Sequence, residues 1–195
     1  MPAGRPRAFS KDDVLDRALE VFWRKGYEGA ALSDLTAAMG INRPSLYAAF
    51  GDKQSLFRAV LQRYVEGPGS FVGRALAEPS VQAAVARLLR EAADELTAPG
   101  RPPGCLAIHG ALACSDAGAA AQADLAAQRR ASEAAIRARL ERARDEGDLA
   151  PEVDPVALAT FIATVFQGMA VQAASGSSRD TLRGVAEMAL AGLRL

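Results

Sequence analysis

Cys105 and His109 are the side chains in this sequence best suited to chemistry, because a spacing of four residues puts both on one face of a helix. Three interpretations are open. Cys105 could sense electrophiles or oxidants, since the start of a helix stabilises a thiolate. The pair could bind a metal, although no fourth ligand follows at the spacing of a structural zinc site. The sequence favours the third interpretation, in which both residues are core or pocket-lining groups.

An enzyme built on this Cys/His pair is a remote alternative. Nucleophilic catalysis needs a third group that orients the base, and no acid stands in a recognisable motif beside the pair. We therefore expect no catalytic residues, no cofactor and no metal site. The chemistry of this protein is expected to be binding.

Composition predicts an all-α protein of about nine helices. Half of the 195 residues are apolar and only 6% are aromatic, and runs of β-branched residues typical of strands are absent. The formal net charge is zero, so any contact with nucleic acid must come from a local patch. Two cysteines argue against a disulfide framework. The N-terminal residues lack the apolar core of a signal peptide, so we expect a cytoplasmic protein.

Residues 32–50 predict two short helices joined by a tight turn. Leu32, Leu35 and Met39 form one apolar face at i, i+3 and i+7. Gly40 then ends the first helix, because glycine accepts a positive φ. Asn42 can cap the second helix through its side-chain oxygen. This helix-turn-helix pattern is typical of proteins that insert the second helix into the major groove of DNA.

The second of these helices is expected to expose a polar face. Its inward positions are Leu46 and Phe50, which leaves the intervening side chains toward solvent. Arg5 and Arg7 precede the first helix and could reach phosphates or a minor groove. The equally weighted alternative is that this N-terminal arm makes no contact.

The remaining chain predicts further helices separated by clear breaks. Gly26 is expected to end the first helix. A Pro/Gly-rich loop spans 98–104, and an apolar helix is expected from Cys105 to Cys114. The segment 155–178 carries no charge, so a membrane span must be considered. Its glutamines and its lack of flanking aromatic anchors favour a buried helix instead, and no membrane contact. With the last helix it suits a subunit interface formed by Phe161, Val165, Gly168, Met169, Gln172, Leu182, Val185 and Met188.

The N-terminal part resembles the TetR (tetracycline-repressor-like) family of transcriptional regulators. The landmarks follow one another in order over about 50 residues: Ala18-Leu-Glu-Val-Phe, Gly26-Tyr, Leu35-Thr-Ala-Ala-Met-Gly-Ile, Ser45-Leu-Tyr and Phe50-Gly-Asp-Lys. Beyond residue 70 the resemblance is one of all-helical architecture. The sequence Pro103-Gly-Cys-Leu-Ala-Ile-His also resembles the start of the sixth helix in one large branch of the family.

This resemblance implies two domains and a defined activity. Residues 1–60 would form the DNA-binding domain, and residues 61–195 a helical regulatory and dimerisation domain. The family binds palindromic double-stranded operator DNA as a homodimer, with recognition helices roughly 34–36 Å apart. Most members are repressors released by a small-molecule effector. Release by thiol modification, or a dimeric regulator without a ligand, remain alternatives.

The resemblance also assigns roles to individual DNA-contacting residues. Arg43 is suited to a bidentate contact with guanine, and Pro44 to an apolar contact with a thymine methyl. The polar contacts fall to Ser33, Ser45, Tyr47 and Lys53, of which the last two would hold phosphates. Two departures from the family matter: Ala31 leaves the first helix poorly capped, and Ala48 with Ala49 leaves base readout chiefly to Arg43.

The effector is expected among the helices between Tyr64 and Glu146. Phe161 or Phe166 could line its pocket from the uncharged helix, together with Cys105 and His109. An apolar lining predicts a moderately apolar, still unidentified small molecule.

Overall fold

The computed structural model describes residues 10–112 and 114–193, and this part of the chain is all α-helical. The all-α prediction is confirmed, with ten α-helices in the described part instead of about nine, because the short α5 is a separate element. Two 3₁₀ turns, at Pro68–Ser70 and Asp116–Gly118, complete the description. The helices are α1 Lys11–Gly29, α2 Leu32–Met39, α3 Arg43–Phe50, α4 Lys53–Glu66, α5 Phe71–Leu76, α6 Val81–Leu96, α7 Leu106–His109, α8 Ala119–Asp145, α9 Pro155–Ala174 and α10 Arg179–Gly192.

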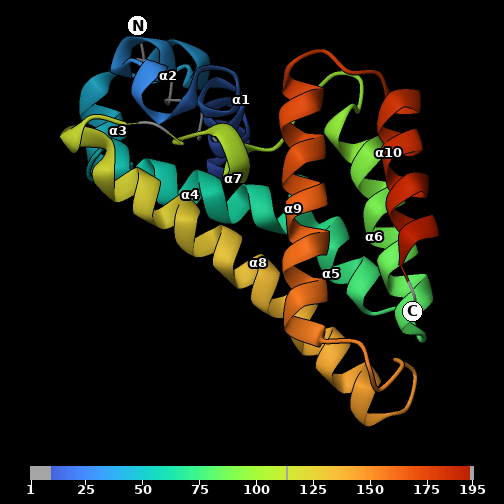
Figure 1. Cartoon of the computed structure of the whole chain (residues 1–195). Helices are drawn as coiled ribbons and strands as arrows, with labels where there is room; N and C mark the ends of the chain where they lie inside the picture. Colours follow the sequence, from blue (N-terminus) through green and yellow to red (C-terminus); the bar gives the residue numbers. More distant parts are fainter. Residues whose placement is uncertain (1–9, 113, 194–195) are drawn as a thin grey trace, which may run out of the picture.

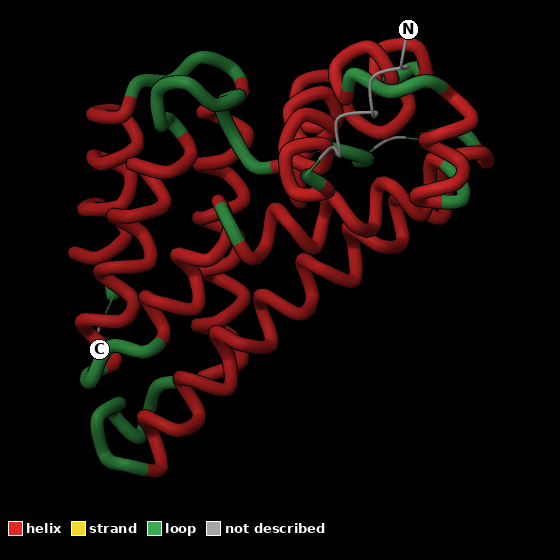
Figure 2. The backbone as a smooth tube through the Cα atoms, turned by 180° about the vertical axis from the view of Figure 1, so that it is seen from behind, coloured by secondary structure: helices red, strands yellow, loops and turns green. Residues whose placement is uncertain are grey.

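The helices form a small cluster and a larger stack that two long helices connect. α1, α2 and α3 gather at one end of the molecule (Figure 1). α4 and α8 lead away from this cluster, and α6, α9 and α10 stand on the other side. Figure 2 shows the same arrangement from behind, with loops confined to the ends of the helices. α4 runs continuously across residue 60, where the sequence predicts a domain boundary.

Local capping fixes where α2, α3 and α4 begin. The Asn42 side chain accepts a hydrogen bond from the Ser45 N–H at 2.9 Å, as predicted. The Asp52 carboxylate accepts one from the Ser55 N–H at 2.6 Å. Ala31 cannot cap α2, but the Asp34 carboxylate accepts the Ala31 N–H at 3.2 Å and supplies half of a capping box.

α1 continues past the glycine at which the sequence predicts its end. Gly26 adopts φ +69°, which kinks the helix, and one further turn follows to Gly29. A Cβ atom at position 26 would lie 3.0 Å from the carbonyl oxygen of Gly110. The Tyr27 N–H donates to that same oxygen at 2.8 Å. Glycine is therefore required where α1 meets the segment after α7.

The helix predicted from Cys105 to Cys114 is mostly wrong. The structure forms only α7 there, a four-residue helix, and turns follow it. Glycine is required directly after α7, because a Cβ at position 110 would lie 2.7 Å from the Leu106 carbonyl oxygen and 2.8 Å from its Cδ1. The chain then turns toward α1 before α8 begins.

α9 is the one helix in the described part of the chain that has the length and apolar composition of a membrane span. The structure buries only one of its faces: Ile162, Met169 and Ala173 pack in the core. The predicted burial holds for this face alone in the protomer, because Phe161 and Val171 are each 45% exposed, and Phe161 is among the residues expected at a subunit interface. The uncharged helix α9 therefore has one apolar face in the core and another on the surface.

Candidate nucleic-acid interface and internal cavity

A closed apolar core holds α2 and α3 against α1 and α4. Leu35, Met39 and Leu46 are fully buried. The Phe57 ring of α4 packs edge-on against Phe22 at 5.0 Å and against Tyr27 at 5.1 Å between ring centroids. This packing fixes the orientation of α3 relative to the rest of the chain.

The outer face of α3 is exposed. Arg43, Pro44 and Ser45 lie at its N-terminal end, and Tyr47 is 47% exposed one turn later. Among the described residues Arg43 has no ion-pair or hydrogen-bond partner for its guanidinium. Ser33 is exposed on the neighbouring α2. These five residues, which the sequence predicts as DNA contacts, thus leave their side chains accessible.

Lys53 and the N-terminal arm complete the predicted DNA contacts. Lys53 is the first residue of α4, and its Nζ lies over the Tyr27 ring, 4.5 Å from the centroid. Partial burial lowers the pKa of the Lys53 ammonium. Arg5 and Arg7, also predicted to contact DNA, lie outside the described residues.

Three contacts between distant parts of the sequence help to join this helix-turn-helix unit, α1 to α4, to the helices behind it. The Asp124 carboxylate of α8 accepts hydrogen bonds from Gln54 at 2.5 Å and from Arg58 at 2.8 Å. The Glu28 carboxylate accepts the Ser115 N–H at 2.8 Å and its hydroxyl, and this lowers the pKa of Glu28. The third contact is the backbone hydrogen bond from Tyr27 to Gly110. The residues in each contact are distant in sequence, so no local sequence pattern predicts these contacts.

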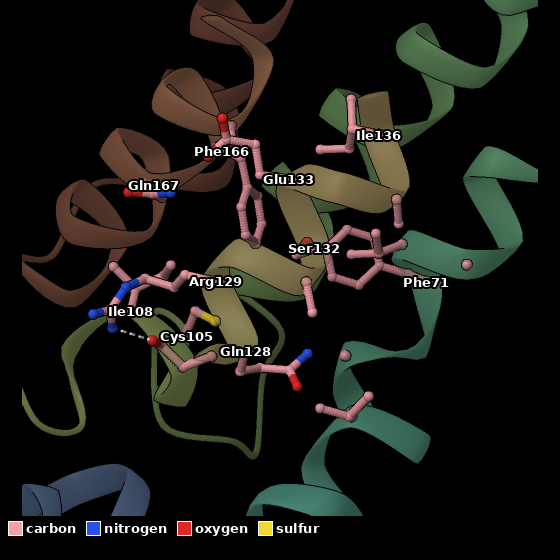
Figure 3. A pocket seen from close by; sticks show the side chains of 18 of the residues that line it. Phe71, Cys105, Ile108, Gln128, Arg129, Ser132, Glu133, Ile136, Phe166 and Gln167 are labelled. Atoms are coloured by element: carbon pink, nitrogen blue, oxygen red, sulfur yellow. Dashed lines mark hydrogen bonds between the residues drawn. The ribbon is translucent and has the colours of Figure 1, made fainter. Parts of the chain in front are cut away.

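A cavity of about 320 Å³ lies between the long helices behind this unit (Figure 3). Its apolar wall comes from several elements of the fold: Tyr64, Phe71, Leu76, Ile108, Ile136 and Phe166. This location agrees with the region between Tyr64 and Glu146 that the sequence predicts for an effector. Phe166 lines the cavity, but Phe161 does not, because it lies on the outer face of α9.

Cys105 lines the cavity, whereas His109 does not. The Tyr64 hydroxyl donates to the Cys105 Sγ at 3.0 Å. Burial raises the pKa of the Cys105 thiol, so the thiolate that the sequence predicts at a helix start is disfavoured. The His109 ring lies against Gly104. A Cβ atom at position 104 would lie 2.9 Å from the His109 Cε1. Burial lowers the pKa of His109.

A few polar groups interrupt the apolar wall: Gln128, Arg129, Ser132, Glu133 and Gln167. The Arg129 Nη1 donates to the carbonyl oxygen of Ala107 at 2.8 Å, the hydrogen bond drawn in Figure 3. The Glu133 carboxylate accepts the Thr160 hydroxyl at 2.8 Å. The sequence alone assigned no function to Arg129, because it is one of several arginines in a long, strongly charged helix. Among the described residues no group of three or more His, Cys, Asp or Glu could hold a metal.

A shallow apolar groove of about 590 Å³ runs between α9 and α10 on the surface. Phe161, Val165, Val185 and Met188 line it, and Met188 is 76% exposed. Gly168 and Gln172 are exposed on α9 nearby. The predicted subunit interface is wrong for two residues. Met169 and Leu182 are 1% and 0% exposed, because they pack into the protomer's own core.

Two family models together match most of the chain. Residues 14–60 match the model described as bacterial regulatory proteins of the tetR family. Residues 79–188 match the model of the tetracyclin repressor-like C-terminal domain. The first match covers most of α1, all of α2 and α3 and about half of α4, and the second covers α6 to α9 and most of α10.

Individual relatives match over nearly the whole chain. The HTH-type transcriptional repressor ComR of Escherichia coli (strain K12) is 35% identical over 189 residues, which is 94% of this chain and 88% of that protein. The uncharacterized HTH-type transcriptional regulator YezE of Bacillus subtilis (strain 168) is 35% identical over 82% of this chain and 83% of that one. A solved structure of a cysteine mutant of the regulator CifR, complexed with 26-base-pair double-strand operator DNA, is 44% identical. It has a TM-score of 0.93 and covers 97% of this chain and 100% of that one.

Proposed function

The chain belongs to the TetR family of transcriptional regulators, and we propose that it is a homodimeric repressor whose operator release is controlled from the cavity. The relatives ComR and CifR are, by name, a repressor and a regulator complexed with operator DNA. In a bacterium such a regulator works in the cytoplasm. Residues 1–60 act as the DNA-binding domain and residues 61–195 as the regulatory and dimerisation domain.

The observation that carries DNA recognition is the exposed α3 above a closed core. Arg43 stands at the N-terminal end of this helix, where side chains of helix-turn-helix proteins reach base edges. A free arginine fork suits the two acceptors of guanine in the major groove. Pro44, Ser45 and Tyr47 contact the thymine methyl and the phosphates around it. Lys53, at the start of α4, holds a further phosphate.

The α9–α10 groove supports the homodimer. Exposed apolar side chains there, including Phe161, Val185 and Met188, form a contiguous patch. Such patches mark interaction surfaces in soluble proteins. A second copy of the same face would bury them and place two copies of α3 on one side of a palindromic duplex.

The cavity supports an effector-controlled switch. Its wall is mostly apolar with a few polar groups, as in small-molecule sites. It borders α4, which is part of the helix-turn-helix unit, and α7, which contacts α1. A ligand that fits the cavity better in one arrangement of these helices than in the other shifts the protein away from the DNA-bound form.

Binding of selected duplexes tests the proposal. A palindromic site is first selected from a random duplex library with the full chain, and its affinity is measured by fluorescence anisotropy at a fixed salt concentration. Arg43→Ala should weaken binding roughly 10- to 100-fold, or about 1–3 kcal/mol, and relax one base position. Its melting temperature should not change, because the side chain is exposed. Arg130→Ala on α8 is the matched control. Unchanged operator binding in Arg43→Ala would contradict the assignment.

Thiol modification at Cys105 is the second way to switch the same cavity. The Sγ atom lies in the cavity wall and accepts the Tyr64 hydroxyl, so an added group would displace that contact. Iodoacetamide should then release the wild-type protein from its operator, slowly because the buried thiol is largely protonated, but leave Cys105→Ser bound. Cys114→Ser is the matched control. Release of Cys105→Ser by the reagent would rule out this route.

A further inference from the structure

The cavity contains a guanidinium whose charge has no protein partner. Within the described part of the chain Arg129 forms no ion pair, and its one hydrogen bond is the contact from Nη1 to Ala107. Arginine carries five N–H donors in a rigid fork. The edge formed by Nε and Nη2 is therefore available to a molecule inside the cavity. A charge that is partly removed from water without a counter-ion is unfavourable, so this position favours an anion.

The charges in the cavity wall are separated. Arg129 and the buried Cys105 both belong to the wall, but burial outweighs the charge of Arg129 and raises the pKa of the thiol, so Cys105 supplies no counter-ion. Glu133, one turn further along α8, binds the Thr160 hydroxyl at an exposed position. Figure 3 shows the Glu133 carboxylate beside α9, apart from the Arg129 guanidinium, which lies toward α7. The inner end of the cavity is thus positive, and the negative group is engaged at its edge.

The rest of the wall suits a hydrocarbon body. Phe71 and Phe166 form a tilted aromatic pair with ring centroids 6.0 Å apart, and Ile136 lies beside them in the wall (Figure 3). The volume of about 320 Å³ is at the lower end of the range for small-molecule sites. One aromatic ring or a medium-length chain with a single polar head fits these dimensions.

We propose that the effector is a small amphipathic carboxylate whose charged group pairs with the Arg129 fork and whose apolar body packs against Phe71 and Phe166. This inference rests on the proposed function, which makes the cavity an effector site. A planar guanidinium binds a carboxylate through two parallel hydrogen bonds, which gives both strength and orientation. Neutral molecules of the same shape leave the guanidinium unpaired.

The same guanidinium links the ligand to the DNA-binding unit. Arg129 holds the Ala107 carbonyl of α7, and the Gly110 carbonyl after α7 accepts the Tyr27 N–H of α1 at 2.8 Å. A carboxylate competes with Ala107 for the charge of Arg129 and weakens the contact that holds α7. Because α7 is only four residues long, a change at its inner side is passed directly to α1.

Three probes of one shape test the inference: 3-phenylpropionate, 3-phenylpropionamide and 3-phenylpropylamine. Their dissociation constants are measured by isothermal titration calorimetry on the full chain, and their effect on operator binding by fluorescence anisotropy. The carboxylate should bind at least about tenfold tighter than the amide and the amine, as expected for a charge-assisted pair. It should also release operator DNA at a lower concentration than they do.

Arg129→Gln should abolish the preference for the carboxylate, because its amide can still hold Ala107 but carries no charge. Arg129→Lys keeps the positive charge but loses the planar guanidinium, so it should retain part of the preference for the carboxylate. Arg130→Gln, an exposed change of the same kind on the next residue, should leave the preference unchanged. Melting temperatures of the variants separate misfolding from loss of binding.

Three results would overturn the inference: equal or tighter binding of the amide or amine, a preference that persists in Arg129→Gln, or no calorimetric binding of the carboxylate at millimolar concentration. If a neutral probe binds and releases DNA as well as the carboxylate does, the inference that the effector is a carboxylate is wrong, but the proposed function stands. If the chain ignores every selected duplex, the proposed function itself falls, whatever the probes do.

Discussion

The helix-turn-helix unit and the cavity differ in how completely they are packed. In the first, Phe57 and Leu46 are fully buried, and the functional side chains stand outside this core. In the second, side chains such as Phe166 border an empty space, and the function depends on that space. The DNA-binding face therefore needs rigid support, whereas the effector site needs packing that a ligand can complete. Substitutions in the two regions should differ accordingly.

The largest expected difference concerns truncation of one phenylalanine in each region. Phe57→Ala removes a ring that contacts two other rings in the closed core, and should cost about 3–5 kcal/mol of unfolding free energy. Phe166→Ala removes a partly exposed ring that already lacks neighbours on its cavity side, and should cost roughly 1–2 kcal/mol. Urea unfolding followed by circular dichroism measures both. Equal costs would mean that the cavity is not a packing defect in solution.

Capping offers a smaller test of how firmly α3 is held. Asn42→Ala removes the side-chain acceptor of the Ser45 N–H and should cost about 1 kcal/mol of unfolding free energy. It should also weaken operator binding, because α3 begins at this cap. Ser10→Ala is the matched control, since Ser10 makes no side-chain capping bond at α1, and it should change stability by less than about 0.5 kcal/mol. A Ser10→Ala effect as large as that of Asn42→Ala would contradict this account of the cap.

The smallest expected effect concerns the ion pair between α1 and α4. The Arg63 guanidinium donates to both Asp16 oxygens, at 2.8 and 2.9 Å, and holds the pKa of Asp16 below its usual value of 3.8. The ionised Asp16 then stabilises the folded state above that usual pKa, and this stability is lost as the pH falls through the lowered value.

The pair is largely exposed, so the contribution should be below about 1 kcal/mol. Urea unfolding of wild type and Asp16→Asn between pH 2 and 6, at about 0.1 M salt, checks it. The difference between the two proteins should vanish at the acidic end. A difference that grows toward low pH would contradict the direction of the pKa shift.

Most of the helix-turn-helix unit could be predicted from the sequence, because local signals determine it. Asn42 and Gly40 stand next to the helix ends that they define, and the apolar spacing of Leu35 and Met39 marks the buried face. The exposed positions of Arg43 and Tyr47 follow from the same periodicity. Only the continuation of α1 past Gly26 was missed, since it depends on the distant Gly110.

The cavity could be predicted only in its approximate place. Its wall comes from five helices, so no single stretch of sequence carries its pattern. His109 and Phe161 have suitable residue types, but the short α7 and the outer face of α9 turn them away from the cavity. Arg129 was missed for the converse reason, because it lies in a helix whose other arginines are mostly on the surface. The burial of Met169 and Leu182 likewise depends on which helices pack against α9 and α10.

The mass of the protein–DNA complex tests the central claim most directly. Sedimentation velocity of the full chain with a labelled palindromic duplex, at low ionic strength, should give two protomers per duplex. Met188→Glu, which puts a charge into the exposed α9–α10 groove, should reduce that complex without lowering the melting temperature. One protomer per duplex, or no binding to any symmetric site, would contradict the account.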